Sequence, residues 1–101
     1  MSHPELPLIL SPQAEMDLTD VLQYTLETWG EAQMHAYGAV LDKALLTLQE
    51  NPQIGHPRPE LSAEHRTFPA GRHIIVYRVT DSAIYVSRIL HERMDIPRHV
   101  N

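Results

Sequence analysis

The chain has 101 residues, no cysteine and a formal net charge of −5 at pH 7 with histidine counted as neutral. This length fits one domain with a core of its own, and the absence of thiols excludes disulfides, thiolate zinc sites and cysteine nucleophiles. The sequence has neither an apolar run of bilayer-spanning length nor a segment of signal-peptide type, so we expect a single cytoplasmic domain, residues 1–101, without a membrane partner.

The two halves of the chain differ in the sign of their charge. Residues 1–50 contain eight acids and one base, Lys43, whereas residues 51–101 contain five acids and seven arginines. A net-acidic chain is a poor candidate for nonspecific duplex binding, but arginines gathered on a sheet can bind a carboxylate or a phosphate of a partner. We therefore expect no sequence-specific nucleic-acid binding by this chain alone.

The first predicted elements are a strand and a helix. Residues 6–10 form a short apolar run, and Pro7 places it at a strand start or a sheet edge because proline has no N–H to donate to a neighbouring strand. Ser11 can cap a helix that begins at Pro12, and we predict this helix over about residues 12–29. Its apolar residues recur every three or four positions and predict a buried stripe: Ala14, Leu18, Val21, Leu22, Thr25 and Trp29.

A second helix is predicted over residues 31–50, because the apolar spacing stays helical and no proline follows until Pro52. Its stripe contains Met34, Tyr37, Leu41, Ala44, Leu45 and Leu48. The link at Gly30 is so short that the two helices must be antiparallel neighbours. We expect both Trp29 and Tyr37 in the core.

The second half of the chain predicts a loop and strands. Residues 51–65 are expected to form a loop that prolines stiffen, followed by a short strand over residues 66–69. Residues 72–79 and 83–91 are dense in Ile, Val and Tyr and flank a turn at Asp81, which predicts a β-hairpin. With a regular two-residue turn, the core face of the hairpin would contain Ile75, Tyr77, Val79, Ile84, Val86 and Leu90. The opposite face would carry Arg72, Arg78, Tyr85 and His91 beside Ile74, Val76 and Ile89.

Together these elements predict an α+β fold in the order β-α-α-β-β-β, with the helical hairpin packed on a small antiparallel sheet. No internal repeat and no second-domain boundary interrupts the pattern. We expect the sheet face that mixes arginine, tyrosine and histidine to be the functional face, because a fully buried surface would not accept these groups without polar partners.

His91 is the first candidate for chemistry. A histidine at a strand end beside Arg88 and Arg93 can act as a general acid or base near neutral pH. The alternative interpretation is a structural histidine that hydrogen-bonds the turn. Arg88 falls on the core face of a regular hairpin, so we expect it to form an ion pair with a helix carboxylate at the edge of the core.

The remaining candidates are groups that bind a partner. Arg72 and Arg78 have two interpretations, contact with a target or an acidic partner, and ordinary packing on a sheet surface. The full candidate binding set comprises Arg72, Arg78, Tyr85, His91 and Arg93. The other histidines of the second half are His56, His65, His73 and His99. Their spacing matches no metal-ligand pattern, so we expect no metal site, and no motif predicts a cofactor.

Three stretches carry a resemblance to a known family. Residues 8–18 read LILSPQAEMDL, residues 51–59 read NPQIGHPRP, and residues 88–95 read RILHERMD. In this order and at these separations they resemble the ParE branch of the RelE/ParE toxins, over nearly the whole chain. The resemblance implies a bacterial type II toxin–antitoxin system with a role in plasmid stabilisation, in which a ParD-like antitoxin wraps and silences the toxin.

The resemblance leaves the mode of action open. ParE-branch toxins are associated with poisoning of DNA gyrase, whereas RelE-branch toxins cut mRNA on the ribosome. RNA cleavage needs proton-transfer groups and cations around the scissile phosphate, which here would be His91 with Arg72 and Arg78. RelE-branch proteins also supply lysines, whereas Lys43 is the only lysine of this chain and lies within a predicted helix. We therefore favour a non-enzymatic gyrase inhibitor, and a domain that only binds its antitoxin is a third reading.

Overall fold

The computed structural model describes residues 6–100. Residues 1–5 and 101 of the predicted domain lie outside the described part, and so does the start of the N-terminal stretch considered above for a signal segment. Its helices are α1 (Pro12–Trp29), α2 (Glu31–Glu50) and α3 (Ile96–His99). Its strands are β1 (Leu8–Leu10), β2 (His56–Pro57), β3 (His65–Ala70), β4 (His73–Val79) and β5 (Ile84–His91). The predicted α+β fold is confirmed. Two short elements, β2 and α3, are additions to the predicted order.

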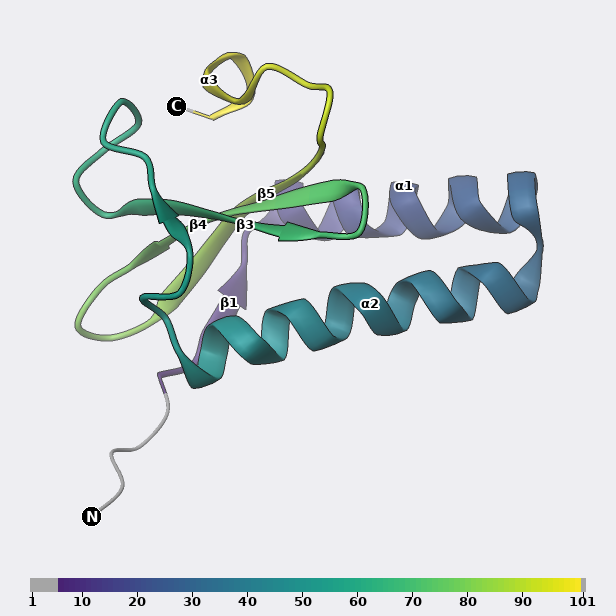
Figure 1. Ribbon diagram of the computed structural model, residues 1–101, viewed down its shortest axis with the longest axis horizontal. Helices are drawn as coiled ribbons and strands as arrows, with labels where there is room; N and C mark the ends of the chain where they lie inside the picture. The colour runs from purple at the N-terminus through teal and green to yellow at the C-terminus, as the bar shows by residue number, and fades with distance from the viewer. Residues whose placement is uncertain (1–5, 101) are drawn as a thin grey trace.

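The strands form one five-stranded sheet in the order β1-β5-β4-β3-β2. The strands β2 to β5 pair in antiparallel fashion, as predicted, whereas β1 runs parallel to β5. The helical hairpin of α1 and α2 lies on one side of the sheet and α3 lies on the other, and the far end of the hairpin extends past the sheet (Figure 1). Within residues 6–100 no helix combines the length and the apolar character needed to cross a membrane.

Local signals set the ends of the two long helices where the sequence predicts them. The Ser11 hydroxyl accepts the N–H of Ala14 at 3.0 Å, and Pro12 occupies the first helical position. Gly30 ends α1 with a φ of 93°, a conformation that residues with a side chain rarely adopt, and its N–H donates to the Leu26 carbonyl. This single residue lets α2 begin at once in the opposite direction.

The main core lies between the sheet and the helical hairpin. Its fully or nearly fully buried members are Ala14, Leu41, Ala44, Leu45, Leu48, Ala70, Ile75, Tyr77, Ile84, Val86 and Ile89. The predicted stripe of α2 is therefore confirmed from Leu41 onward. The stripe of α1 is confirmed at the buried Ala14 and Thr25 and at Leu18 and Val21, which pack partly buried against the core. Trp29 is 70% exposed, so its predicted place in the core is wrong. Trp29 lies at the far end of the hairpin, which no strand covers.

A β-bulge divides the hairpin of β4 and β5. Near the turn the predicted register is confirmed, since Val79 pairs with Ile84 and Tyr77 pairs with Val86. The next pair is Val76 with Arg88, so β5 contains one extra residue, Ser87. Every side chain beyond Ser87 changes face relative to a regular strand. Consequently Ile89, and not the predicted Leu90, packs in the main core, and His91 also lies on the helix-facing side.

A second apolar cluster covers the other face of the sheet. Its members are Val76, Leu90, Ile96 and Val100, with Leu61 and Ile74 packed against them. The Arg88 guanidinium bonds Asp17 of α1 in a bidentate pair at 2.8 and 2.9 Å and also donates to the His99 carbonyl. The expected pair between Arg88 and a helix carboxylate is confirmed, although the bulge sets Arg88 opposite Val76. This bond raises the pKa of Arg88 above its ordinary value.

Residues 51–64 form the predicted loop except at β2, where His56 pairs with Thr67 of β3, and His65, predicted as loop, already belongs to β3. One buried tyrosine fixes this loop. The Tyr77 hydroxyl accepts the N–H of Gly55 and donates to the Pro52 carbonyl, both at 2.9 Å. Burial raises the pKa of Tyr77, which keeps the hydroxyl protonated for this second bond. A loop with no regular structure over most of its length is thereby held by a core side chain.

Candidate functional site

A groove of about 720 Å³ lies between the far part of the helical hairpin and one end of the sheet. The helices contribute Asp20, Val21, Tyr24, Thr25, Trp29, Gln33 and Tyr37 to its walls. The sheet end contributes Gly71, Arg72, His73 and His91. Because the hairpin extends past the strands, the aromatic rings of Tyr24 and Trp29 have no sheet to pack against and are 63% and 70% exposed. An exposed apolar surface of this kind is typical of a binding site.

Tyr37 joins α2 to the turn between β3 and β4. Its hydroxyl accepts the N–H of Arg72 at 2.9 Å and lies 2.6 Å from Nδ1 of His73. Gly71 in this turn has a φ of 60°, and a Cβ there would lie 2.7 Å from the Tyr37 ring. The turn therefore requires glycine both for its backbone conformation and for the approach of the ring. Tyr37 fixes the position of the Arg72 backbone at the mouth of the groove.

His73 and His91 form the floor of the groove. They are paired residues of β4 and β5, and their rings meet edge to face with centroids 5.3 Å apart. Burial lowers the pKa of His73, and the neighbouring His91 lowers it further, against a smaller opposite effect from Asp17 and Glu92. The Nδ1 atom of His91 accepts the N–H of Arg93 at 3.2 Å. Both rings thus make defined contacts in a partly buried setting.

Arg72 is the exposed cation among the residues that line the groove. Its side chain is 75% exposed, and the nearest carboxylate, Glu92, lies 3.9 Å from its guanidinium. At this distance and exposure the ion pair is weak, so the cation is free to bind another anion. Asp20 lies on the helical wall of the same groove. The groove therefore combines apolar walls with a cation from the sheet end and a carboxylate from α1.

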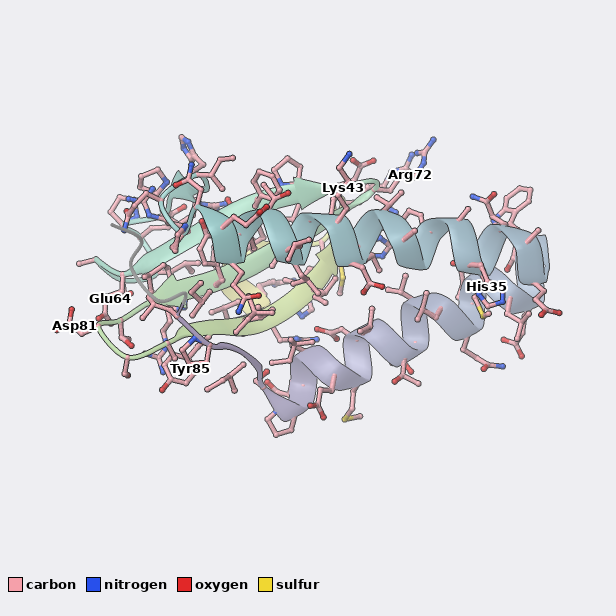
Figure 2. The ribbon with its side chains drawn as sticks, turned by 90° about the horizontal axis from the view of Figure 1, so that it is seen from below. His35, Lys43, Glu64, Arg72, Asp81 and Tyr85 are labelled. Atoms are coloured by element: carbon pink, nitrogen blue, oxygen red, sulfur yellow. The ribbon has the colours of Figure 1, made fainter. Side chains whose placement is uncertain are left out.

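The structure separates the candidate residues into two groups. Arg72 and His91 share the groove, and the backbone of Arg93 bonds His91. Arg78 and Tyr85 are paired on the opposite sheet face, where the guanidinium lies 4.5 Å from the centre of the Tyr85 ring. Figure 2 shows Arg72 and Tyr85 at opposite ends of the sheet. The predicted single face carrying Arg72, Arg78, Tyr85 and His91 is therefore wrong. The bulge at Ser87 turns His91 to the helix-facing side, and Arg72 lies in the turn before β4, where the alternation of the strand does not apply.

Four residues of the groove were not predicted as functional candidates from the sequence: Tyr24, Trp29, Tyr37 and His73. A signal for His73 was present, since strict alternation from Ile75 already places it on the helix-facing side of β4. No comparable signal marks Trp29, because helical periodicity gives the face of a side chain but not the point at which the sheet ends. Among residues 6–100 no group of three or more His, Asp or Glu side chains is arranged to hold a metal ion.

Comparison with protein families places the chain among known toxins. Residues 8–96 match the model of the ParE toxin of type II toxin–antitoxin systems. Toxin ParE1 of Mycobacterium tuberculosis is 37% identical over 93 residues, which cover 91% of this chain and 95% of that protein. Toxin ParE1 of Caulobacter vibrioides is 32% identical over 94 residues, which cover 93% of this chain and 97% of that protein.

Solved structures share the fold at lower identity. The chromosomal ParDE toxin–antitoxin system from P. aeruginosa contains a chain that matches with a TM-score of 0.73 at 19% identity, covering 86% of this chain and 96% of that one. The RelBE2 toxin–antitoxin complex from Mycobacterium tuberculosis matches with a TM-score of 0.63 at 20% identity, covering 87% of this chain and 99% of that one. These likenesses confirm the RelE/ParE-like fold. On its family match and its relatives, the chain belongs to the ParE toxin branch of the RelE/ParE superfamily and is the toxin of a type II toxin–antitoxin system.

Proposed function

We propose that this toxin acts in the cytoplasm by binding and poisoning DNA gyrase, and that a ParD-like antitoxin neutralises it. One observation supports a non-enzymatic mode of action: the side chains that RNA cleavage would need lie apart from one another. Arg72 and His91 lie in the groove, whereas Arg78 lies on the opposite face against Tyr85. General acid–base catalysis requires its groups within hydrogen-bond reach of one substrate, and these three residues do not converge on one.

The sheet face away from the hairpin offers little room for an RNA strand. Much of it is occupied by the apolar cluster in which Leu90 and Val76 pack against Ile96 and Val100. Arg88, a further cation of β5, is already bonded to Asp17 with both side chains mostly buried. A scissile phosphate would therefore find few free cations on the described part of that face, which supports action through a binding surface instead of through RNA cleavage.

The groove supports the antitoxin part of the proposal. Its exposed rings and apolar walls fit an apolar segment of a partner, and its rim presents Arg72 and Asp20 to charges that flank such a segment. Two structural relatives come from systems that pair a toxin with an antitoxin, ParDE and RelBE2. We infer that an antitoxin segment lies along the groove and covers Tyr24 and Trp29.

Expression without antitoxin tests the mode of action. Wild type, His91→Ala and the matched control His56→Ala, which changes an exposed histidine outside the groove, are expressed while DNA damage signalling and transcript cleavage at ribosome positions are followed. We expect a DNA damage response in all three strains, because the loss of one imidazole from a binding surface costs around 1 kcal/mol outside a few anchor residues.

A ribosome-dependent endoribonuclease gives the opposite pattern. Loss of a proton-transfer group lowers its rate by about 10²- to 10⁴-fold. Rapid mRNA cleavage in the wild type and the His56→Ala control, absent in His91→Ala and without a DNA damage response, would replace gyrase poisoning by the nuclease function. Purified gyrase that binds none of the three proteins would also overturn the proposal.

A further inference from the structure

The Tyr37 hydroxyl and the His73 ring share one short hydrogen bond whose direction depends on protonation. The oxygen lies 2.6 Å from Nδ1 of His73, already accepts the N–H of Arg72, and lies 3.4 Å from the Ala70 carbonyl. A hydroxyl has a single proton to donate. When His73 is neutral and carries its ring proton on Nε2, Tyr37 donates its hydroxyl proton to Nδ1. The hydroxyl and Nδ1 then both have a hydrogen-bond partner.

Protonation of His73 reverses this arrangement. A charged ring carries a proton on Nδ1, so it becomes a donor to the Tyr37 oxygen. The hydroxyl must then turn its own proton toward Ala70, at the 3.4 Å separation that is beyond the usual range of an O–H···O bond. The 2.6 Å bond then runs from the ring to the oxygen, the hydroxyl proton is left with only the long contact to Ala70, and the positive charge sits on a partly buried ring. The geometry of the β3–β4 turn therefore favours the uncharged imidazole.

Charged groups surround His73 from β5, the β3–β4 turn, α1 and the segment after β5, whereas α2 contacts it through the uncharged Tyr37. His91 of β5 and Arg72 of the turn oppose a positive charge at this position. Asp17 and Asp20 of α1 and Glu92 after β5 favour it. Burial is the largest effect and acts with His91, so the pKa of His73 lies below its ordinary value. The free groove thus holds a neutral histidine in its floor at neutral pH.

We propose that His73 is a proton-linked sensor in the floor of the groove, over which an apolar segment of the antitoxin closes more tightly when the ring is uncharged. This inference rests on the proposed function. An apolar segment that covers the floor removes the remaining water from the ring and penalises its charged form further. The complex therefore binds fewer protons than the free toxin, and acid loosens it.

Affinity measured across pH tests this coupling. The purified full-length antitoxin is titrated into wild type, His73→Gln and the control His56→Gln between pH 5.5 and 8. Glutamine keeps a polar side chain near Tyr37 but does not titrate. For one linked proton, affinity should fall by up to about tenfold per pH unit in the wild type and in the control once the pH drops below the lowered pKa of His73 in the free toxin, beyond any fall seen in His73→Gln.

A second measurement needs no antitoxin. The His73 ring of the free toxin is followed by NMR as the pH is lowered, in the wild type and in Tyr37→Phe. We expect His73 to titrate below the ordinary histidine range, and its pKa to rise in Tyr37→Phe because the hydrogen bond to the neutral ring is lost. An unchanged pKa in Tyr37→Phe, or titration in the ordinary range, overturns the sensor.

The outcomes separate the two proposals. Antitoxin binding with the same pH dependence in wild type and His73→Gln overturns the sensor and leaves the antitoxin partnership intact. Affinity that rises in acid only when His73 is present also overturns it, because that result places a partner carboxylate, not an apolar segment, on the ring. Absence of binding at every pH overturns both.

Discussion

Tyr77 illustrates how one hydroxyl can hold a loop. The side chain is fully buried, and its oxygen bonds Gly55 and Pro52 from the middle of β4. Removal of the oxygen leaves a buried N–H and a carbonyl without their partner. We predict that Tyr77→Phe lowers the free energy of unfolding by about 1–3 kcal/mol, measured by urea denaturation.

The matched control for this change is Tyr24→Phe. Tyr24 is 63% exposed, and a hydroxyl in water is not lost from any buried network. Its removal should change the free energy of unfolding by less than about 0.5 kcal/mol. Equal effects of the two substitutions would contradict the role of Tyr77 in fixing the loop.

Individual residues differ in how far the sequence predicts their roles. The ion pair of Arg88 was predictable, because a guanidinium on a buried strand must find a carboxylate and α1 supplies several. The position of His91 was not, because it depends on a shift of one residue at Ser87. A side chain four positions past such a shift keeps its chemistry but lies on the other face of the sheet.

At the scale of elements, α1 and β5 are joined by one acidic side chain. Asp17 accepts two bonds from Arg88 and the N–H of Ile89 at 2.9 Å. The Asp17 and Arg88 side chains are only 14% and 19% exposed. We predict that Asp17→Ala lowers the free energy of unfolding by about 3 kcal/mol, because it leaves a mostly buried guanidinium without its counter-ion.

Asp95→Ala provides the charge-matched comparison in the same denaturation experiment. Asp95 pairs with Arg98 at 3.9 Å, and both side chains are more than half exposed. An exposed pair of this geometry contributes between 0 and about 1 kcal/mol. A loss in Asp17→Ala no larger than that in Asp95→Ala would show that the pair does not join α1 to the sheet.

The ends of the helices were predictable and the bulge was not, for a physical reason. Ser11, Gly30 and Pro52 act on their immediate neighbours in the chain, so local patterns are sufficient. The bulge at Ser87 accompanies contacts made by α1, since the Ser11 hydroxyl donates to the Ser87 carbonyl at 2.8 Å. This partner is 76 positions away in sequence, and alternation within β5 carries no record of it.

At the scale of the molecule, the helical hairpin is longer than the sheet that supports it. The unsupported end carries Trp29, the only tryptophan of the chain. We predict that Trp29 fluorescence in the free toxin has the emission of an indole in water and shifts to shorter wavelength on antitoxin binding. The antitoxin used should contain no tryptophan, or have phenylalanine in its place.

The affinity of Trp29→Ala provides a second measure of the same contact. A large aromatic anchor at the centre of an interface typically contributes 2 kcal/mol or more, so we expect at least about 30-fold weaker antitoxin binding. The control is Met16→Ala, an exposed apolar residue of α1 outside the groove. Emission that stays unchanged in a complex of full affinity would place the antitoxin elsewhere on the toxin.

Two tyrosines of this fold each lie against a glycine. The Tyr37 ring leaves no space for a Cβ at Gly71, and the Tyr77 ring leaves none at Gly55. The Tyr77 hydroxyl also accepts the N–H of Gly55 itself, and the Tyr37 hydroxyl accepts the N–H of Arg72, the residue after Gly71. Over evolutionary time neither member can change freely, so related toxins that have lost one of these glycines should also have lost the facing tyrosine. Each pair is expected to be inherited as a unit, although its members lie in separate parts of the chain.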